Sequence, residues 1–463
     1  MRQAVIYPST QAHLIIKGGK EKCRSLSTEH IVSIGKRGDK AAILQIFENM
    51  CNEEEIASQA IGNIRKRQLD EIRKRMPENK QGYEFKINGH TFVAFIRRLT
   101  PSECAELQTI PHDYEFVSSE TQQYHGIGNG WNIETIKHIF QFIPEEIKKD
   151  MKVLSLFDGI SGGQMALNGI GAKVSTYLAS EIDKHAIANT MHNFPNTIQL
   201  GSVTELNVDK MVQQYGIPNI LIGGSPCQGF SMSGKLKGAA TSHGEEIYTL
   251  DRYLELKAQG FEFDGQSYLF WEYMRVLTEL RKYNPNILFF LENVEMLDKW
   301  ERCLSHAIGV RGVHINSALV SAQQRKRIYW SNIKVKDLGN TSLFDFSDDP
   351  FEWPSLKTDI PQPEDRGIVI KDILQDIVGD KYYLKDGTTS QLIEKTDKKK
   401  LKDYLLEPQM SVDEVLEYMN TDSEYLSCTD EEKREIAILG YELEKKRLHD
   451  NYYGKERYFY EKE

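Results

Sequence analysis

The sequence predicts an α/β fold with a mainly parallel sheet, and its 463 residues leave room for a second, smaller domain. Short apolar runs rich in β-branched and aromatic residues recur along the chain, a pattern typical of buried strands. The runs end at glycine, proline or acidic residues, and a helical pattern follows the first of them. They comprise residues 152–157, 174–180, 218–222 and 286–291. Because open α/β sheets bind ligands at the carboxyl ends of their strands, the functional site is expected in the loops after these runs.

The first run leads into the glycine-rich turn 158–163, and a helix is expected over 164–169. Glycines at this place let the backbone approach a nucleotide-like ligand closely, although such a turn is about as often structural. The second run ends in Glu181-Ile182-Asp183. Both turns are therefore candidates for one side of a ligand pocket.

The third and fourth runs end beside candidate catalytic residues. The loop after 218–222 carries Cys227, and the run 286–291 ends at Glu292. Taken alone, a cysteine is more often a small buried hydrophobe than a nucleophile. Glu292 could equally cap a helix that starts at Val294. Found together at the ends of two strands, they favour a shared catalytic crevice.

A fifth run, residues 320–330, is also expected as a strand and contains Arg325 and Arg327. Residues two apart in a strand point to one face, so both guanidinium groups are expected on the same side. Pairing with surface acids is the alternative for these arginines.

These residues, in this order, resemble the motif series of the DNA cytosine-5 methyltransferases. The matching stretches are Phe157-Asp158-Gly159-Ile160-Ser161-Gly162-Gly163, Ser225-Pro226-Cys227-Gln228, Glu292-Asn293-Val294 and Gln323-x-Arg325-x-Arg327. The resemblance implies a Rossmann-like sheet that binds S-adenosyl-L-methionine, a smaller target-recognition domain, and double-stranded DNA as partner. It also implies no metal, and it makes a cognate restriction endonuclease a candidate partner.

The chemistry of cytosine agrees with the residues that the resemblance assigns. A thiolate from Cys227 adding to carbon 6 makes carbon 5 nucleophilic enough to accept a methyl group. A carboxyl group with raised proton affinity at ring nitrogen 3 assists this addition, and Glu292 fits that role. Arg325 and Arg327 would hold the cytosine oxygen, the flanking phosphate and the glutamate, with Arg327 implied as the base contact. The base must first be flipped out of the duplex.

The resemblance also assigns binding residues. For Glu181, the expected partners are the ribose hydroxyls of the cofactor. The cofactor-binding set is Phe157, Asp158, Gly159, Ile160, Ser161, Gly162, Glu181, Ile182, Ser202, Val203, Pro226, Asn129, Gly130 and Trp131, and the DNA-contacting set is Gln228, Ser231 and Gln323. Ser202 departs from the family, in which many members carry aspartate at this position; a serine can still hydrogen-bond the adenine amino group.

The closing cofactor motifs, which usually come last in the family, are expected near the amino terminus. Arg98–Gln108 resembles the penultimate motif and Gly126–Trp131 the last one, so the chain is predicted to be circularly permuted. A catalytic domain is expected over 98–333, with closing motifs in 98–145 and the others in 152–330. Residues 334–463 together with 1–97 would form the target-recognition and accessory region. Residues 238–266 are expected as a mobile lid or a surface insertion.

Composition fits this prediction once the distribution of charge is considered. The formal net charge is −10, but residues 403–463 hold 17 acidic and 8 basic side chains, which leaves the rest near −1. Residues 1–40 hold 8 basic and 3 acidic side chains and could contact phosphate. The 6 scattered cysteines form no Cys-x-x-Cys pair, and no signal or membrane-spanning pattern is found, so a cytoplasmic protein of a prokaryotic or phage-infected cell is expected.

Two other functions remain open at this point. The first is tRNA cytosine-5 methylation, which some family members perform, although the Cys-Phe-Thr tripeptide associated with that branch is absent. The second is a catalytically silent DNA-binding or regulatory subunit. Ser202 favours that alternative, and the complete set of Cys227, Glu292, Arg325 and Arg327 argues against it.

Overall fold

The computed structural model describes residues 96–226, 239–339, 351–375, 378–385 and 387–388, together with four strands before residue 98 and scattered positions between 416 and 438. The chain forms two compact units. One comprises Lys22–Arg24 and Pro101–Ile373, and the other comprises Met1–Glu21, Ser25–Thr100 and Leu374–Glu463.

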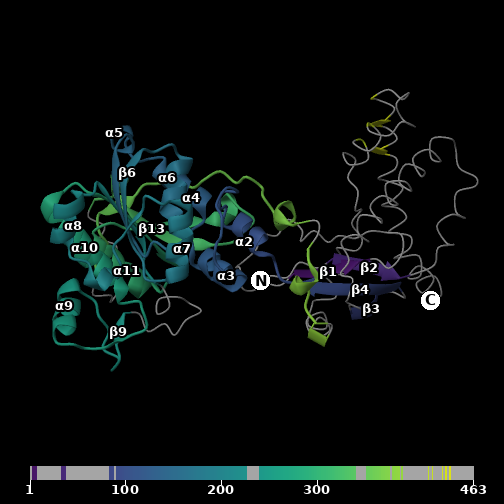
Figure 1. The fold of residues 1–463 in the computed structure, drawn as a ribbon, viewed down its shortest axis with the longest axis horizontal. Helices are drawn as coiled ribbons and strands as arrows, with labels where there is room; N and C mark the ends of the chain where they lie inside the picture. Colours follow the sequence, from purple (N-terminus) through teal and green to yellow (C-terminus); the bar gives the residue numbers. More distant parts are fainter. Residues whose placement is uncertain are drawn as a thin grey trace, which may run out of the picture. The chain divides into compact units, whose positions relative to one another are not determined.

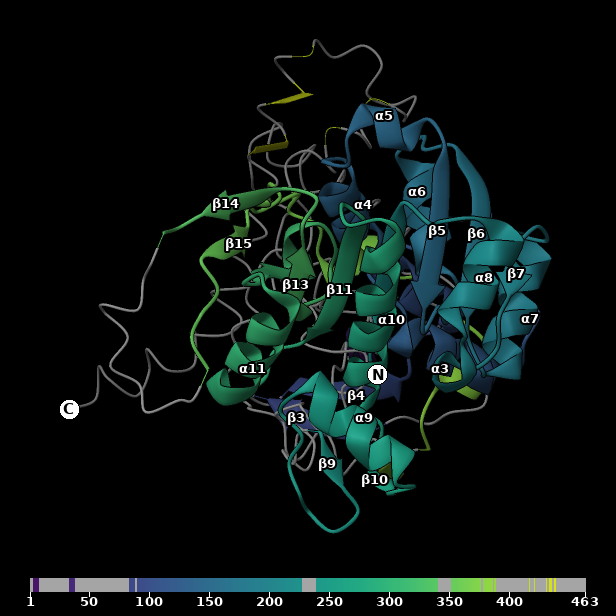
Figure 2. The ribbon, with the colours of Figure 1, turned by 90° about the vertical axis from the view of Figure 1, so that its left-hand side faces the viewer.

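The unit formed by Pro101–Ile373 contains a seven-stranded sheet, which confirms the predicted α/β class (Figures 1 and 2). Its strand order is β12-β13-β11-β8-β5-β6-β7. From β11 to β7 neighbouring strands are parallel, whereas β13 is antiparallel to both β11 and β12. The strands are β5 (Met151–Leu156), β6 (Val174–Ser180), β7 (Ile198–Gln199), β8 (Ile220–Gly224), β11 (Leu288–Val294), β12 (Val313–Asn316) and β13 (Lys326–Ser331). The four predicted apolar runs are thus β5, β6, β8 and β11.

Helices cover both faces of this sheet. On one face lie α4 (Ile133–Phe140), α6 (Gly162–Gly169) and α7 (Lys184–Asn193), and on the other α8 (Val208–Tyr215), α10 (Leu269–Tyr283) and α11 (Asp298–Ile308) (Figure 1). Local sequence sets several of their starts: the side chains of Asn132 and Asp183 accept hydrogen bonds from the first-turn N–H groups of α4 and α7. The predicted helix 164–169 is α6, which begins two residues earlier than expected.

The core lies between the sheet and these helices. Side chains of β8 and β11 such as Leu221, Phe289 and Leu291 are fully or almost fully buried, as expected for parallel strands covered on both faces. Gly163 on α6 permits a very close approach to the sheet, because a Cβ there would lie 2.4 Å from Ile222 Cδ1 and 2.7 Å from the Tyr177 hydroxyl.

The segment before β5 packs into the same unit. It forms α2 (Pro101–Leu107), α3 (Glu120–Asn129), α4 and the short α5 (Glu145–Lys148). Phe140 of α4 packs edge-on against Phe290 of β11, with ring centroids 5.1 Å apart. The Thr135 hydroxyl, also on α4, donates to the Ser317 hydroxyl at 3.0 Å within the core. Residues far apart in the sequence therefore share one core.

Shorter elements complete this unit. After β8 an insertion forms the β9–β10 pair (Ala240–Thr241 and Phe263–Asp264), with α9 (Leu250–Ala258) between the two strands. Residues 334–373 add β14 (Val335–Asp337), β15 (Leu356–Thr358) and the 3-10 turn η4 (Ile370–Ile373). The 3-10 turns η1 (Val203–Glu205) and η2 (Ser317–Leu319) lie after β7 and β12.

The other unit contains a four-stranded antiparallel sheet around β4 (His90–Arg97), which pairs with β1 (Gln3–Tyr7), β2 (Ser33–Arg37) and β3 (Tyr83–Ile87). A late segment joins this sheet: Leu384 N donates to Ile96 O at 2.7 Å and Arg98 N donates to Tyr382 O at 2.9 Å. The two ends of the chain thus contribute to one unit. Among the described residues, no helix is long and apolar enough to cross a membrane.

Candidate active site

The carboxyl ends of β5, β6, β8 and β11 meet at one edge of the sheet, and the predicted site residues follow these strands. The direction in which successive strands are added to the sheet reverses at β5, because β6 lies on one side of β5 and β8 on the other. In doubly wound folds this switch point leaves a crevice between the loops, where ligands bind.

The loop after β5 is tightly constrained. Phe157 and Ser161 have φ angles of 58° and 64°, a left-handed conformation that is costly for residues with side chains. The Tyr114 hydroxyl donates to Ile160 O at 3.0 Å, and the N–H of Gly159 donates to Glu181 Oε2 at 2.8 Å. The surrounding structure therefore holds this loop in a shape that the chain alone would rarely adopt.

Asp158 is a buried carboxylate in that loop. Its Oδ1 accepts a hydrogen bond from the Tyr177 hydroxyl at 2.7 Å, whereas its Oδ2 is buried without a hydrogen-bond partner in the described structure. Burial, with a smaller contribution from the charge of Glu181, raises the pKa of Asp158 to about 6, although the hydrogen bond from Tyr177 opposes the rise. A ligand that brings a donor or a positive charge would satisfy this oxygen, and S-adenosylmethionine carries both an ammonium and a sulfonium group. The residues present thus fit that cofactor.

Glu181, after β6, is held by three backbone N–H groups. Besides Gly159, the N–H groups of Ile182 and Asp183 donate to its Oε1 at 2.7 and 2.8 Å. The Glu181 carboxylate is therefore fixed in position. Beside it the Ile182 side chain is 72% exposed.

The Ser202 side chain forms hydrogen bonds with a residue close to it in the chain. Its Oγ lies 2.8 Å from the Thr204 hydroxyl and accepts from the Thr204 N–H at 3.3 Å, so it caps η1. The neighbouring Val203 is buried. Ser202 thus caps η1, and an aspartate at this position could cap it in the same way.

The loop after β8 is described as far as Pro226, so Cys227, Gln228 and Ser231 lie outside the described residues. The start of the loop is fixed by Asn293, whose Nδ2 donates to the Ser225 hydroxyl at 3.0 Å and to Ser225 O at 3.3 Å. In the parallel register, Gly224 of β8 is the partner of Glu292 on β11. The strand that leads to Cys227 therefore ends directly beside Glu292.

Glu292 and Arg327 form an ion pair at this edge. Arg327 Nε lies 2.8 Å from Glu292 Oε1, and the side chains are only 20% and 11% exposed. The predicted strand 320–330 is wrong in its first half, because β13 begins at Lys326 after a turn that is stabilised by hydrogen bonds of Ser321. Arg325 therefore precedes the strand, and it has different partners from Arg327.

Arg325 binds the carboxyl end of α3. Its Nη2 donates to Gly130 O at 2.8 Å and its Nη1 lies 3.5 Å from Gly128 O. Gln108, directly after α2, supports the same end, because its Nε2 donates to Ile127 O at 2.9 Å and lies 3.3 Å from Gly130 O. Side-chain donors from two distant segments thus bind the carbonyls at the end of this helix.

Trp131, directly after that end, lies next to β8 and β11. Its ring centroid is 5.3 Å from that of Phe290, and a Cβ at Gly224 would lie 2.7 Å from Trp131 Nε1 and 3.1 Å from Glu292 Oε2. Only a glycine fits between this indole and Glu292 without displacement. Asn129, by contrast, is exposed, and its Nδ2 lies 3.1 Å from His125 Nε2.

Gln323, for which the family resemblance implies a contact with DNA, is buried, and its Oε1 has no hydrogen-bond partner in the described structure. Residues to which the sequence assigned no individual role also build the site, namely Gln108, Tyr114, Tyr177, Gly224 and Asn293. Of these, Gln108 and Asn293 stand within predicted motifs and Gly224 adjoins one, whereas the two tyrosines showed no recognisable local pattern. In the described residues, no group of three or more His, Cys, Asp and Glu side chains could hold a metal ion.

Comparison with known proteins identifies the class to which this fold and site belong. A model of the family described as C-5 cytosine-specific DNA methylase matches residues 15–145 and 151–310, and the chain belongs to this family of enzymes. An orphan methyltransferase, M.Rho11sI of Bacillus phage rho11s, is 28% identical over 283 residues, which cover 55% of this chain and 49% of the relative. The chain thus spans about half the length of that relative.

Two further similarities are more distant. The DNA (cytosine-5)-methyltransferase DRM2 of Oryza sativa subsp. japonica is 25% identical over 169 residues, which cover 34% of this chain and 28% of the relative. Among solved structures, the DNMT2 of Spodoptera frugiperda is similar over 65% of this chain and 99% of its own, with 15% identity and a TM-score of 0.31.

Proposed function

We propose that this protein methylates carbon 5 of a flipped cytosine in double-stranded DNA, with S-adenosylmethionine as methyl donor and Cys227 as nucleophile. The observation that carries the proposal is the Glu292–Arg327 ion pair beside Gly224, three residues before Cys227. A carboxylate, a guanidinium and a thiol are the groups that addition to a pyrimidine needs.

In the proposed reaction, the Cys227 thiolate forms a bond to carbon 6 of the cytosine, and the electron pair of the 5,6 double bond moves to carbon 5. Glu292 faces ring nitrogen 3 and holds a proton there while negative charge develops on the ring. Arg327 holds Glu292 and the base oxygen in position. Bound S-adenosylmethionine supplies the electrophilic methyl group. Loss of the proton on carbon 5 and departure of the thiolate then restore the aromatic ring.

The cofactor would be held by the loops after β5, β6 and β7. Asp158 and Glu181 supply carboxylates for its ammonium group and ribose hydroxyls, and Ile182 with Val203 supplies apolar contacts to the adenine. Ser202 would contact the adenine amino group. The backbone of Gly159–Gly162 and of Asn129–Trp131 would close the pocket, with Phe157 and Pro226 beside the ligand.

A circular permutation accounts for the position of the closing segment. Its support is that Arg325 and Gln108 bind the end of α3 and that Trp131 packs beside Gly224, within one compact unit. The other unit joins residues from both ends of the chain, as the bridge of Arg97 to Tyr383 illustrates. We assign target recognition to residues 1–97 and the part of the chain after residue 333, with Gln228, Ser231 and Gln323 completing the DNA contacts.

The experiment that tests this function traps the covalent adduct. Duplex DNA containing 5-fluorocytosine and S-adenosylmethionine should convert the native protein into an adduct that survives denaturation, because fluorine cannot leave as the carbon-5 proton does. Cys227→Ser should form none, and Cys303→Ser, which changes a buried thiol that contacts Tyr248 O, should form it normally. Adduct formation with 5-fluorocytosine tRNA but not with the duplex would replace DNA by tRNA as substrate.

A further inference from the structure

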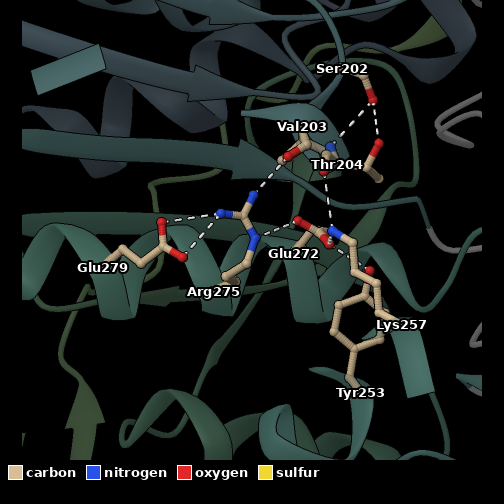
Figure 3. Close-up of polar contacts among 8 residues, drawn as sticks. All are labelled: Ser202, Val203, Thr204, Tyr253, Lys257, Glu272, Arg275 and Glu279. Atoms are coloured by element: carbon tan, nitrogen blue, oxygen red, sulfur yellow. Dashed lines mark hydrogen bonds and ion pairs between the residues drawn. The ribbon is translucent and has the colours of Figure 1, made fainter. Parts of the chain in front are cut away.

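A buried ionic network connects η1 with α9 and α10 (Figure 3). Glu272 on α10 is fully buried, and its carboxylate receives three donors. Its Oε1 accepts from the Tyr253 hydroxyl at 2.6 Å and from Lys257 Nζ at 2.5 Å, and its Oε2 accepts from Arg275 Nε at 2.8 Å. A buried carboxylate is costly unless it is paired, so Glu272 fixes the positions of both cations.

Both cations also bind carbonyls of the loop after β7. Arg275 Nη2 donates to Val203 O at 2.8 Å, and Lys257 Nζ donates to Thr204 O at 3.1 Å (Figure 3). Arg275 pairs in addition with Glu279, so two acidic and two basic side chains balance. The network therefore sets the position of the loop that carries Ser202 and Val203, the residues proposed to contact adenine.

The two cations differ in where they come from. Arg275 lies on the same helix as Glu272 and is 12% exposed, so its contacts are built into the core. Lys257 is 35% exposed and comes from α9, in the insertion between the paired strands β9 and β10. This insertion follows the loop that carries Cys227. Lys257 thus connects the segment after the nucleophile to the wall of the cofactor pocket.

We propose that Lys257 is a positioning residue that couples cofactor binding to the packed position of α9. This inference rests on the proposed function, because it takes the loop after β7 to hold the adenine. The hydrogen bond from Lys257 to the Thr204 carbonyl keeps the loop after β7 in the conformation that binds the cofactor. A bound cofactor in turn favours the packed position of α9. Linkage requires the two effects to be equal.

Binding measurements on the full chain without nucleic acid test the first effect. Lys257→Met keeps the apolar stem and removes the charged donor, and it should weaken binding of S-adenosylmethionine and S-adenosylhomocysteine by about fivefold to tenfold each. Lys257→Arg should restore affinity to within about twofold of native. Lys282→Met, at an exposed position on α10, is the matched control and should bind as native does.

Steady-state kinetics distinguish positioning from general damage. The methionine variant should raise KM for S-adenosylmethionine by the same factor while kcat stays within about twofold, because the loop acts on binding and touches no reacting atom. An equal fall in kcat with unchanged KM would overturn the proposal.

Hydrogen exchange tests the second effect and uses the native protein, so it does not depend on a variant that folds. Saturating S-adenosylhomocysteine should slow amide exchange in 250–258, and this slowing should be lost in Lys257→Met. Unchanged exchange of α9 in the native protein would refute the coupling. A native protein that binds no cofactor would refute the proposed function instead, so the two failures are distinguishable.

Discussion

Glu292 and Arg327 are diagonal neighbours across the antiparallel strands β11 and β13. In this register Glu292 lies opposite Tyr329 and Arg327 lies opposite Val294, so both charged side chains project from the same face of the sheet. Arg327 Nε reaches Glu292 Oε1 at 2.8 Å. Because both groups are largely buried, each determines the orientation of the other.

This pairing predicts coupled effects on catalysis. Glu292→Gln keeps a hydrogen-bonding side chain but loses the proton-donating carboxyl group, so single-turnover methyl transfer should slow by about a hundredfold with a smaller change in DNA affinity. Arg327→Met should cost a similar factor, and the double variant should be no more than about tenfold slower than either, since the two act as a unit. Glu262→Gln, at an exposed position, serves as the control. Fully additive losses would show that the residues act independently.

Asp158 predicts a pH dependence of cofactor binding. Its pKa is raised from 3.8 to about 6. Protonated Asp158 therefore contributes its full stabilisation of the unliganded protein at pH values below 3.8, the pKa taken for the unfolded chain, and this stabilisation is lost as the pH rises through 6. The cofactor, a cation, favours the carboxylate, so affinity should fall by about tenfold between pH 7.5 and pH 5. Calorimetry should show a nearly flat profile for Asp158→Asn, whereas Asp150→Asn, at an exposed position, should keep the native slope. A native affinity independent of pH would remove Asp158 from the cofactor site.

Gly224 predicts a steric effect at the crevice. In Gly224→Ala the new Cβ would lie 2.7 Å from Trp131 Nε1 and 3.1 Å from Glu292 Oε2, so the indole or the strand end must move. Methyl transfer should fall by about tenfold or more, because small displacements at a reacting centre are costly. Gly128→Ala is a matched control, since no atom lies within 4 Å of its Cβ position and it is helical. Thermal unfolding should show that the control is equal to or slightly more stable than native.

The packing of the helices before β5 predicts that the part of the chain with the catalytic motifs cannot fold and bind the cofactor well by itself. A fragment that starts at Met151 lacks α4, whose Ile136, Ile139 and Phe140 are completely buried, and it lacks the α3 carbonyls that Arg325 binds. It should fold poorly and bind S-adenosylmethionine weakly, and adding residues 1–150 as a separate chain should restore part of the binding. Full-strength cofactor binding by the fragment would contradict the permuted architecture.

The structure also changes the expectation for Asn129. If its amide were buried against the cofactor, Asn129→Ala would weaken binding by about 1 to 3 kcal/mol. In the structure its side chain is exposed and its contact is His125 on the same helix. We therefore expect the main contribution of this segment to come from the backbone around Gly130, and Arg325→Met to weaken cofactor binding more than Asn129→Ala does.

The sequence by itself determined the strands and the residues at their ends. Apolar runs such as 218–222 and 286–291 report their own burial, and glycine, proline and acidic residues mark where each strand stops. Because the carboxyl ends of parallel strands meet at one edge, the sequence predicts that Glu292 and the strand leading to Cys227 end at the same edge of the sheet. These features depend on local patterns and on one general rule of topology.

Only the tertiary structure decided which partners those residues take. Arg325 and Arg327 look equivalent in the sequence, yet a turn before β13 sends one to the end of α3, 195 residues away in the chain, and the other to Glu292. The network around Glu272 likewise joins Thr204, Lys257 and Arg275, whose positions show no local pattern. A charged side chain selects among many possible partners by burial and distance, and both are fixed only when distant segments pack together.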